Sequence, residues 1–260
     1  MKRIIAAMLV ALACLGARAT TFSTDATDLW FNVNEQGWGL NVIQQDDILF
    51  ATLFVYGGDN QPRWYVGSDL RYSHSNASGG LVFTGIWYRT TGPYFVVPFN
   101  PNLFNVYPVG TATFTLNGVN SATFTYSVDN VVVSKNVTRQ TWATNWLAGI
   151  YVGATVADYA NCDNPADNGY YEDSAVFTVT QSGSTVTIVQ AAAGFTCTFT
   201  GTYEQHGRLG ELSGNATCGS VQGTFQAHQI EASVTALAGH IQFRNGCTVS
   251  GRFGGVRRMP

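Results

Sequence analysis

The chain of 260 residues is 45% hydrophobic but only 11% charged, and its 13 Lys and Arg against 16 Asp and Glu give a formal net charge of −3. Binding to a phosphate backbone needs clustered Lys and Arg, so this balance argues against a nucleic-acid partner. A surface solvated mainly by hydroxyls and amides is better suited to neutral polar ligands.

The N-terminus has the features of an export signal. Lys2 and Arg3 precede an apolar run over 4–15, which is too short to span a bilayer comfortably. Small residues then stand at the two positions within 17–19 that a signal peptidase reads. We therefore predict a signal peptide over 1–19 and a periplasmic or secreted protein that is not transmembrane after cleavage. Lipid attachment at Cys14 is the alternative.

The cysteines agree with export. Four lie in the second half of the chain, and an even number in an exported protein predicts two disulfides: Cys162, Cys197, Cys218 and Cys247. The expected hairpin registers favour Cys162–Cys197 with Cys218–Cys247. A hairpin turning near Gly207 would bring Cys197 opposite Cys218 just as well, so the connectivity stays open. No C-x-x-C spacing occurs, and we expect no metal site and no cofactor.

Strand signals recur about every dozen residues in the first half, which is typical of all-β folds. Residues 112–116 alternate between apolar and polar side chains, and Asn117-Gly118 and Asp129-Asn130 supply turn residues that tolerate positive φ. The predicted strands lie near 28–32, 37–45, 48–57, 62–70, 80–89, 109–117, 120–128 and 131–140.

The second half repeats this pattern after a short junction at Trp142 to Trp146. Its predicted strands lie near 147–154, 174–182, 184–191, 194–203, 208–218, 220–230, 233–244 and 247–256. Eight strands close a small barrel and remove exposed edges. We therefore predict an all-β protein with two consecutive antiparallel up-and-down barrels of the lipocalin or avidin type, over 20–143 and 144–260. Two β-sandwiches are the alternative.

Residues 155–173 are predicted to form a long loop over one mouth of the second barrel. Loops of this length in a compact domain are usually functional or disordered. The loop is rich in acidic side chains that could ligate Ca²⁺: Asp158, Asp163, Asp167, Glu172 and Asp173. The EF-hand spacing fails because Pro165 occupies a ligand position, so a solvated loop is the simpler interpretation.

The most distinctive motif runs from Trp30 to Asn41 and reads W-F-N-V-N-E-Q-G-W-G-L-N. Here the chain resembles, over about 20–140, an uncharacterised exported β-module of Gram-negative bacteria with the signature W-x-N-x-x-E-x-G-W-G-L-N. Leu53 departs from that module, which carries Trp at this point. The resemblance implies export and a β-fold, and it brings no activity with it.

Aromatic and amide side chains gather around this motif. Flat aromatic bodies with polar tips, combined with directional hydrogen-bonding groups, suit a neutral polar ligand such as a glycan. Gly37 and Gly39 would allow close approach to Trp38. The candidate ligand-binding residues are Trp30, Asn32, Glu35, Trp38, Asn41, Gln44, Trp64, Trp87 and Arg89. The alternative is that the aromatic residues fill the barrel interior.

These patterns favour an exported, non-enzymatic binding or surface-interaction protein, whose partner is a glycan or another cell-envelope component. A hydrolase of polysaccharide or peptidoglycan is an alternative, with Glu35 as general acid and Asp46, Asp47 or Asp69 as the second carboxylate. A structural envelope component is a third interpretation. Absence of aromatic girdles along the strands disfavours an outer-membrane barrel.

Overall fold

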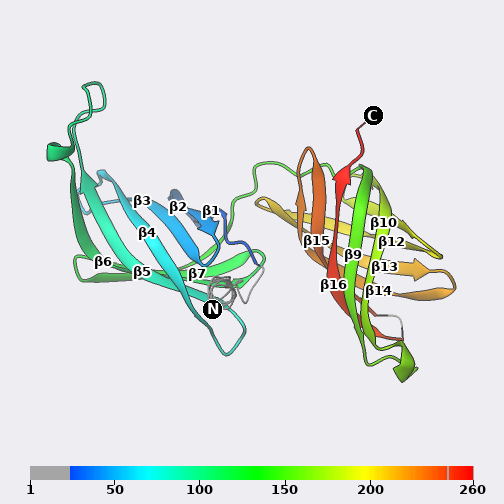
Figure 1. The fold of residues 1–260 in the computed structure, drawn as a ribbon. Helices are drawn as coiled ribbons and strands as arrows, with labels where there is room; N and C mark the ends of the chain where they lie inside the picture. Colours follow the sequence, from blue (N-terminus) through cyan, green and yellow to red (C-terminus); the bar gives the residue numbers. More distant parts are fainter. Residues whose placement is uncertain (1–23, 245, 260) are drawn as a thin grey trace, which may run out of the picture.

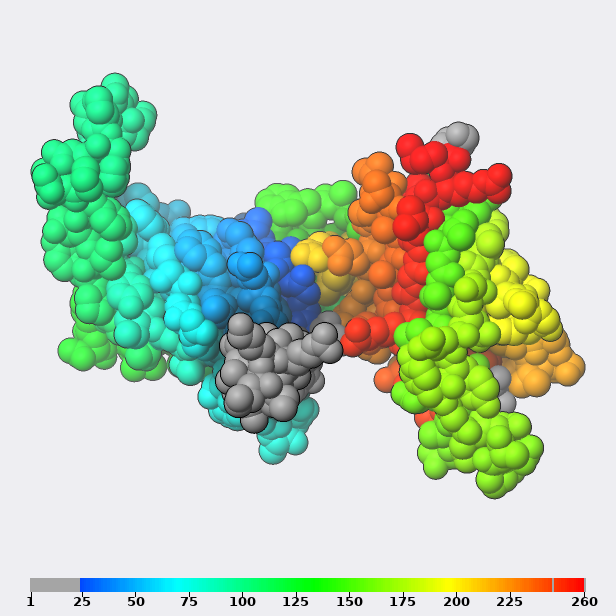
Figure 2. Space-filling model, in the orientation of Figure 1, coloured from blue at the N-terminus to red at the C-terminus, as the bar shows by residue number. Residues whose placement is uncertain are grey.

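The computed structural model describes residues 24–244 and 246–259, so the predicted signal peptide and Cys14 lie outside the described residues. The chain forms two closed antiparallel barrels of eight strands each, β1 to β8 and β9 to β16, joined by residues 140–148 (Figure 1). This confirms the prediction of two consecutive up-and-down barrels over that of two sandwiches. Figure 2 shows the two barrels as separate lobes on either side of a narrower junction.

The strands of the first barrel are β1 (Asp28–Asn32), β2 (Glu35–Gln45), β3 (Ile48–Tyr56), β4 (Pro62–Ser75), β5 (Leu81–Thr91), β6 (Asn105–Gly118), β7 (Ser121–Val128) and β8 (Val131–Arg139). Those of the second are β9 (Gly149–Ala160), β10 (Gly169–Ser182), β11 (Thr185–Ala192), β12 (Phe195–His206), β13 (Leu209–Cys218), β14 (Val221–Ala232), β15 (Ala236–Arg244) and β16 (Thr248–Arg257). Two short 3-10 helices, η2 (Pro101–Leu103) and η3 (Pro165–Asp167), lie in connections.

Period-two alternation determines which side chains fill each barrel. In β6, Phe114 and Leu116 are buried while Thr113 and Thr115 lie on the outer face. The second barrel encloses Phe199 and Phe225, whose ring centroids lie 5.2 Å apart in an edge-to-face contact. Full burial of one such side chain contributes about 1.5–3 kcal/mol to stability. The interiors of the two barrels are separate hydrophobic cores.

The end of the first barrel where β1 begins is closed by an aromatic–arginine pair. Trp30 on β1 lies opposite Arg139 on β8, and the guanidinium stacks on the indole at 4.5 Å. The indole N–H donates to the backbone oxygen of Ala26 at 2.9 Å. Gln44 holds the same segment, since its Oε1 accepts from the Ala26 N–H at 2.7 Å. The preceding chain is thereby fixed across the barrel end.

The second barrel is closed by the same arrangement. Tyr151 on β9 lies opposite Arg257 on β16, whose guanidinium sits 5.1 Å from the ring. The Tyr151 hydroxyl donates to the backbone oxygen of Leu147 at 2.8 Å, and Gln181 Oε1 accepts from the Leu147 N–H at 2.7 Å. Each aromatic residue bonds to the carbonyl four positions upstream. The two barrels are therefore built on one plan.

The closed end of the first barrel contacts the β12–β13 hairpin of the second. Asp28 Oδ2 accepts from Arg139 Nη1 at 3.1 Å and from the backbone N–H of Arg208 at 2.9 Å. The Arg208 guanidinium also pairs with Asp25 at 3.1 Å. Gly207 has a φ of +59°, and a Cβ there would collide with the Asp28 carboxylate. Only glycine fits this turn against the first barrel.

Two predictions about the second half are wrong. Residues 155–173 are not one long loop: β9 continues to Ala160 and β10 begins at Gly169, pairing along their length. The favoured disulfide pairing does not form either: the disulfides are Cys162–Cys247 and Cys197–Cys218, and the second confirms the alternative expected from a hairpin turning near Gly207. Cys197 and Cys218 face each other across the β12–β13 hairpin, whereas β14 separates Cys218 from the turn that carries Cys247.

The connection between β5 and β6 projects beyond the first barrel, as the green segment in Figures 1 and 2 shows. Residues 92–104 contain no charged side chain. Phe95 is 89% exposed, and Tyr94 and Phe99 are also largely exposed. This hairpin is therefore an uncharged, apolar projection from the barrel.

Candidate ligand-binding site

The open end of the second barrel contains a cavity of about 1040 Å³. It lies at the end opposite the Tyr151–Arg257 closure, where β9, β11, β13 and β15 finish and the strands that follow them begin. Its walls are mainly side chains that alternate inward along these strands, including Thr155, Ala157, Tyr159, Tyr171, Asp173, Gln190, Ala192, Phe195, Phe199, Ile241 and Phe243. A cavity of this size is suited to a small molecule.

Aromatic rings form the floor of the cavity. Phe199 and Phe243 lie with ring centroids 5.9 Å apart, edge to face, and Phe177 and Phe253 pack below them in the core. A much smaller space of about 20 Å³ lies among these rings and shares walls with the main cavity. The interior is therefore apolar and closed toward the junction.

A band of polar groups crosses the wall above this floor. Gln190 is only 7% exposed, and its Nε2 donates to the Thr155 hydroxyl at 3.1 Å. Thr155 lies opposite Asp173 across the β9–β10 pair, so the Asp173 side chain enters the cavity beside it. Polar groups placed in an otherwise apolar cavity fix the orientation of a ligand.

Two tyrosines stand between this band and the solvent. Tyr159 and Tyr171 meet edge to face with ring centroids 4.9 Å apart. Burial raises the pKa of Tyr159, and the nearby Asp173 carboxylate and Tyr171 raise it further. The phenol thus stays protonated beside the carboxylate.

The rim is fixed by the disulfides. Cys162–Cys247 ties the segment after β9 to the turn before β16, and the Asp163 N–H donates to the Gly246 oxygen at 2.8 Å. Cys197–Cys218 joins β12 to β13 at the same end. The helix η3 lies in this tethered segment, and its Asp167 lines the mouth. By closing loops, the two disulfides reduce the conformational entropy of the unfolded chain and so stabilise the folded rim.

Several of the sequence-predicted ligand residues belong to the core of the first barrel. Trp30 and Trp87 are fully buried, and no hydrogen-bond partner reaches the Trp87 Nε1 among the described residues. Gln44 is occupied by Ala26 and by the backbone oxygen of Asp46. These three side chains fill or close the barrel, in agreement with the alternative interpretation of the aromatic cluster.

Glu35 and Trp38 lie at the open end of the first barrel. Glu35 Oε2 accepts from Lys135 Nζ at 2.7 Å and from Trp38 Nε1 at 3.1 Å. The hydrogen bond from Lys135 lowers the pKa of Glu35 most, and that from Trp38 adds to it. Trp38, Tyr65 and Tyr126 pack against the core below. This mouth is therefore occupied by the protein's own side chains.

The glycines that flank Trp38 accommodate rings of β3. A Cβ at Gly39 would stand 2.6 Å from the ring of Phe54, and one at Gly37 would stand 3.6 Å from the ring of Tyr56. Phe54 and Trp64 are opposite each other on the outer face, and Trp64 is 53% exposed. The motif thus builds an external aromatic patch of Phe54, Tyr56 and Trp64.

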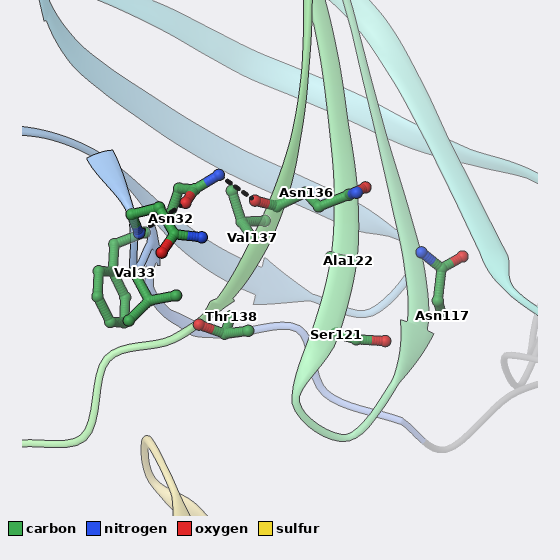
Figure 3. A pocket seen from close by; sticks show the side chains of 10 residues that line it. Asn32, Val33, Asn117, Ser121, Ala122, Asn136, Val137 and Thr138 are labelled. Atoms are coloured by element: carbon green, nitrogen blue, oxygen red, sulfur yellow. Dashed lines mark hydrogen bonds between the residues drawn. The ribbon is translucent and has the colours of Figure 1, made fainter. Parts of the chain in front are cut away.

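The remaining predicted residues do not join that patch. Asn32 lines a pocket of about 410 Å³ beside β7 and β8, where its Nδ2 donates to the Asn136 backbone oxygen at 3.2 Å (Figure 3). Asn41 points outward between the inward-facing Leu40 and Val42. Arg89 is exposed, with its guanidinium 5.5 Å from the ring of Tyr107. The nine predicted residues are thus spread over the core, one mouth and the outer surface.

The carboxylate pairs considered for hydrolysis do not form. Glu35 begins β2, while Asp46 and Asp47 follow its other end. The eleven residues of β2 span about 33 Å at ~3.3 Å per residue, and Asp69 on β4 lies next to Leu70, level with that far end. Glycosidases need their carboxyl groups within about 10 Å of each other.

The acidic residues considered for calcium are also dispersed. Asp173 faces the cavity, while Asp158 and Glu172 point outward because side chains alternate along β9 and β10. Within residues 24–244 and 246–259, no group of three or more His, Cys, Asp or Glu side chains could hold a metal ion. No helix in that part of the chain has the length and apolarity needed to cross a membrane.

Sequence reasoning missed the cavity of the second barrel and the partner of Glu35. Tyr159, Tyr171 and Asp173 are spaced at even intervals within their strands, which is the signal for one inward face. Lys135 lies 100 residues from Glu35 and carries no local signal.

Comparison with protein-family models and with curated proteins gives no match. Among solved structures, the chain is similar to a protein of unknown function from the DUF3598 family of Nostoc punctiforme. The two share 13% identity over 90% of this chain and 96% of the other, with a TM-score of 0.25. At that score the similarity carries no argument about function, and the fold rests on the strand pairing described above.

Proposed function

We propose that the protein is a non-enzymatic binding protein that holds a small, largely apolar molecule in the second barrel. The cavity of about 1040 Å³ at its mouth carries this proposal. Its floor is aromatic, its polar groups are few and its rim is fixed by disulfides, so a ligand would be buried without large rearrangement of the barrel. Burial of apolar ligand surface contributes about 25 cal/mol per Å² before the costs of association.

We also propose that the protein works outside the cytoplasm, exported by the signal peptide expected over 1–19. Its two disulfides support an oxidising, extracytoplasmic compartment. Such a compartment also suits a carrier or sensor of small molecules in the periplasm or the medium.

Neighbouring alanines on β11 allow a matched test. Ala192 lines the cavity, whereas Ala191 is exposed on the outer face. Ala192→Trp should fill the mouth and lower the affinity for a neutral apolar fluorophore, N-phenyl-1-naphthylamine, at least tenfold. Ala191→Trp should leave the affinity within twofold of wild type. Equal affinity of both variants and wild type would show that the fluorophore binds elsewhere.

A second candidate function is glycan binding on the outside of the first barrel. The exposed rings of Phe54, Tyr56 and Trp64 on β3 and β4 support it, because flat aromatic surfaces stack on sugar rings. Trp64→Ala should abolish binding on a glycan array while the fold, measured by circular dichroism, is kept. Binding that survives this change would remove the external patch from consideration.

A further inference from the structure

The charge distribution of the cavity in the second barrel is one-sided. Asp173 and Asp167 line it, and its walls contain no Lys, Arg or His. No basic side chain forms an ion pair with Asp173 anywhere in the described ranges, 24–244 and 246–259. A half-buried carboxylate without a cationic partner is costly unless it gains one on binding.

A second acceptor faces the same space. The Gln190 side chain is more than nine-tenths buried, and Thr155 occupies its Nε2. No donor among the described residues reaches its Oε1, so this carbonyl oxygen is left for a ligand. Asp173 and Gln190 flank Thr155, the first through strand register and the second through the hydrogen bond. Their acceptor oxygens therefore belong to one polar band.

The rings around this band favour positive charge as well. Tyr159 and Tyr171 lie beside Asp173, and Phe195 on β12 also lines the cavity. Aromatic faces attract cations, most strongly where water is excluded. Burial raises the pKa of Tyr159 most, and the Asp173 carboxylate adds to the rise, as expected of a nearby negative charge.

We infer that the ligand of the second barrel is an amphiphilic amine: a protonated amino group bound between Asp173 and Gln190, with an apolar body directed onto the aromatic floor. This inference rests on the proposed function. Along β10 the inward side chains run in the order Tyr171, Asp173, Ala175 and Phe177 from the mouth to the core. The carboxylate thus stands above the apolar floor, where the head of such a ligand would lie.

A matched series of probes tests this assignment. Octylamine, 1-octanol and octanoate each contain eight carbons in an unbranched chain and differ in the charge of the head at pH 7. Isothermal titration calorimetry on the full mature protein should give octylamine an affinity at least tenfold above that of octanol, with octanoate the weakest.

Two aspartate variants test whether the Asp173 carboxylate binds the amino group of the ligand. Asp173→Asn should lower the affinity for octylamine about tenfold and that for octanol several times less. Asp158→Asn is the control, because Asp158 is near the same end of the barrel but points outward from β9. It should change neither affinity by more than about twofold.

The outcomes separate this inference from the proposed function. If all three probes bind equally and Asp173→Asn changes nothing, the cavity binds apolar molecules without preference for an amine, and the inference fails alone. If octanoate binds most tightly, the sign of the assigned charge is wrong. If no probe binds and N-phenyl-1-naphthylamine does not bind either, the proposed function fails with it.

Discussion

The two barrels are closed in the same way and differ at their open ends. Trp30 and Arg139 in the first barrel correspond to Tyr151 and Arg257 in the second. In both, the aromatic side chain also donates a hydrogen bond to the backbone oxygen four positions upstream. At the other end, the Glu35–Lys135 pair and Trp38 occupy the first mouth, whereas the second mouth is hollow and rimmed by disulfides. The two barrels thus share the structure of their closed ends, whereas the capacity to bind a ligand depends on the side chains at each open end.

Removal of a disulfide should distinguish the stabilities of the two barrels most clearly. In the chain-entropy model, the bridge between Cys162 and Cys247, 85 residues apart, is worth about 4–5 kcal/mol, and the one between Cys197 and Cys218, 21 apart, about 3 kcal/mol. Cys162→Ser with Cys247→Ser should therefore destabilise the second barrel by several kcal/mol. Urea unfolding followed by circular dichroism measures this loss.

The first barrel should not respond to that change. Its core indoles, Trp30 and Trp87, report its unfolding by fluorescence. Their transition should keep its midpoint in the Cys162→Ser, Cys247→Ser variant. A parallel loss of both transitions would mean that the barrels unfold as one unit.

Substitution of the two arginines that close the barrels should destabilise the protein by different amounts. Arg139 is buried, and its ion pair with Asp28 is shielded from solvent. Arg139→Met should therefore lower the free energy of unfolding by about 3–5 kcal/mol, because it leaves that carboxylate without a cationic partner. Arg257 donates to the neutral hydroxyl of Tyr151 at 2.6 Å, and Arg257→Met should cost about 1.5–3 kcal/mol. Arg71→Ala, at an exposed pair, is the control and should stay within about 0.5 kcal/mol. Equal losses for Arg139 and Arg257 would contradict the ranking.

The junction can be tested at one glycine. Gly207→Ala should cost about 1–2 kcal/mol from the positive φ and additionally weaken the contact with Asp28. Gly183→Ala is matched to it, since Gly183 has a φ of +58° with open space around the missing Cβ. Calorimetry should show a larger fall in melting temperature for Gly207→Ala than for Gly183→Ala, because only the former also disturbs the contact with Asp28. Equal shifts would mean that this contact contributes nothing to stability.

The smallest expected effect is a pH dependence confined to the second barrel. His228 and His240 stack on its outer face with ring centroids 5.1 Å apart. Burial lowers the pKa of both; Glu211 opposes this at His228, while His228 and Arg252 reinforce it at His240.

A folded-state pKa below the ordinary histidine value means that the unfolded chain binds more protons as the pH falls through about 6.5. Stability is therefore fully present above that pH and is lost toward pH 5, by less than about 1 kcal/mol because the rings remain partly exposed to solvent. Thermal melts should show this slope in wild type and a flatter one in His228→Gln with His240→Gln. An increase in stability on acidification would contradict the sign.

Much of the fold could be predicted because short local sequence patterns determine its strands and turns. Alternation in segments such as 112–116 and turn pairs such as Asn117-Gly118 determine strands and hairpins without knowledge of distant residues. The stretch 155–173 has the sequence features of a loop because its acidic residues, Pro165 and Gly169 conceal the alternation of Tyr159, Tyr171 and Asp173.

The candidate site was harder because it depends on which strand ends meet. The disulfide partners and the Glu35–Lys135 pair are set by barrel closure, which brings together residues 85 and 100 positions apart. An aromatic motif read from sequence cannot separate a buried ring such as Trp87 from an exposed one such as Trp64. That distinction comes from strand register, where a shift by one residue reverses the face.

The most direct test of the contrast between the mouths is a nuclear magnetic resonance titration of the protein with octylamine, following two side-chain signals at once. The Gln190 amide should shift saturably, because it lies in the hollow mouth of the second barrel, while the Trp38 indole N–H, bound to Glu35 in the filled mouth of the first, should stay in place. A saturable shift of Trp38 with no response of Gln190 would contradict the assignment of binding to the second barrel.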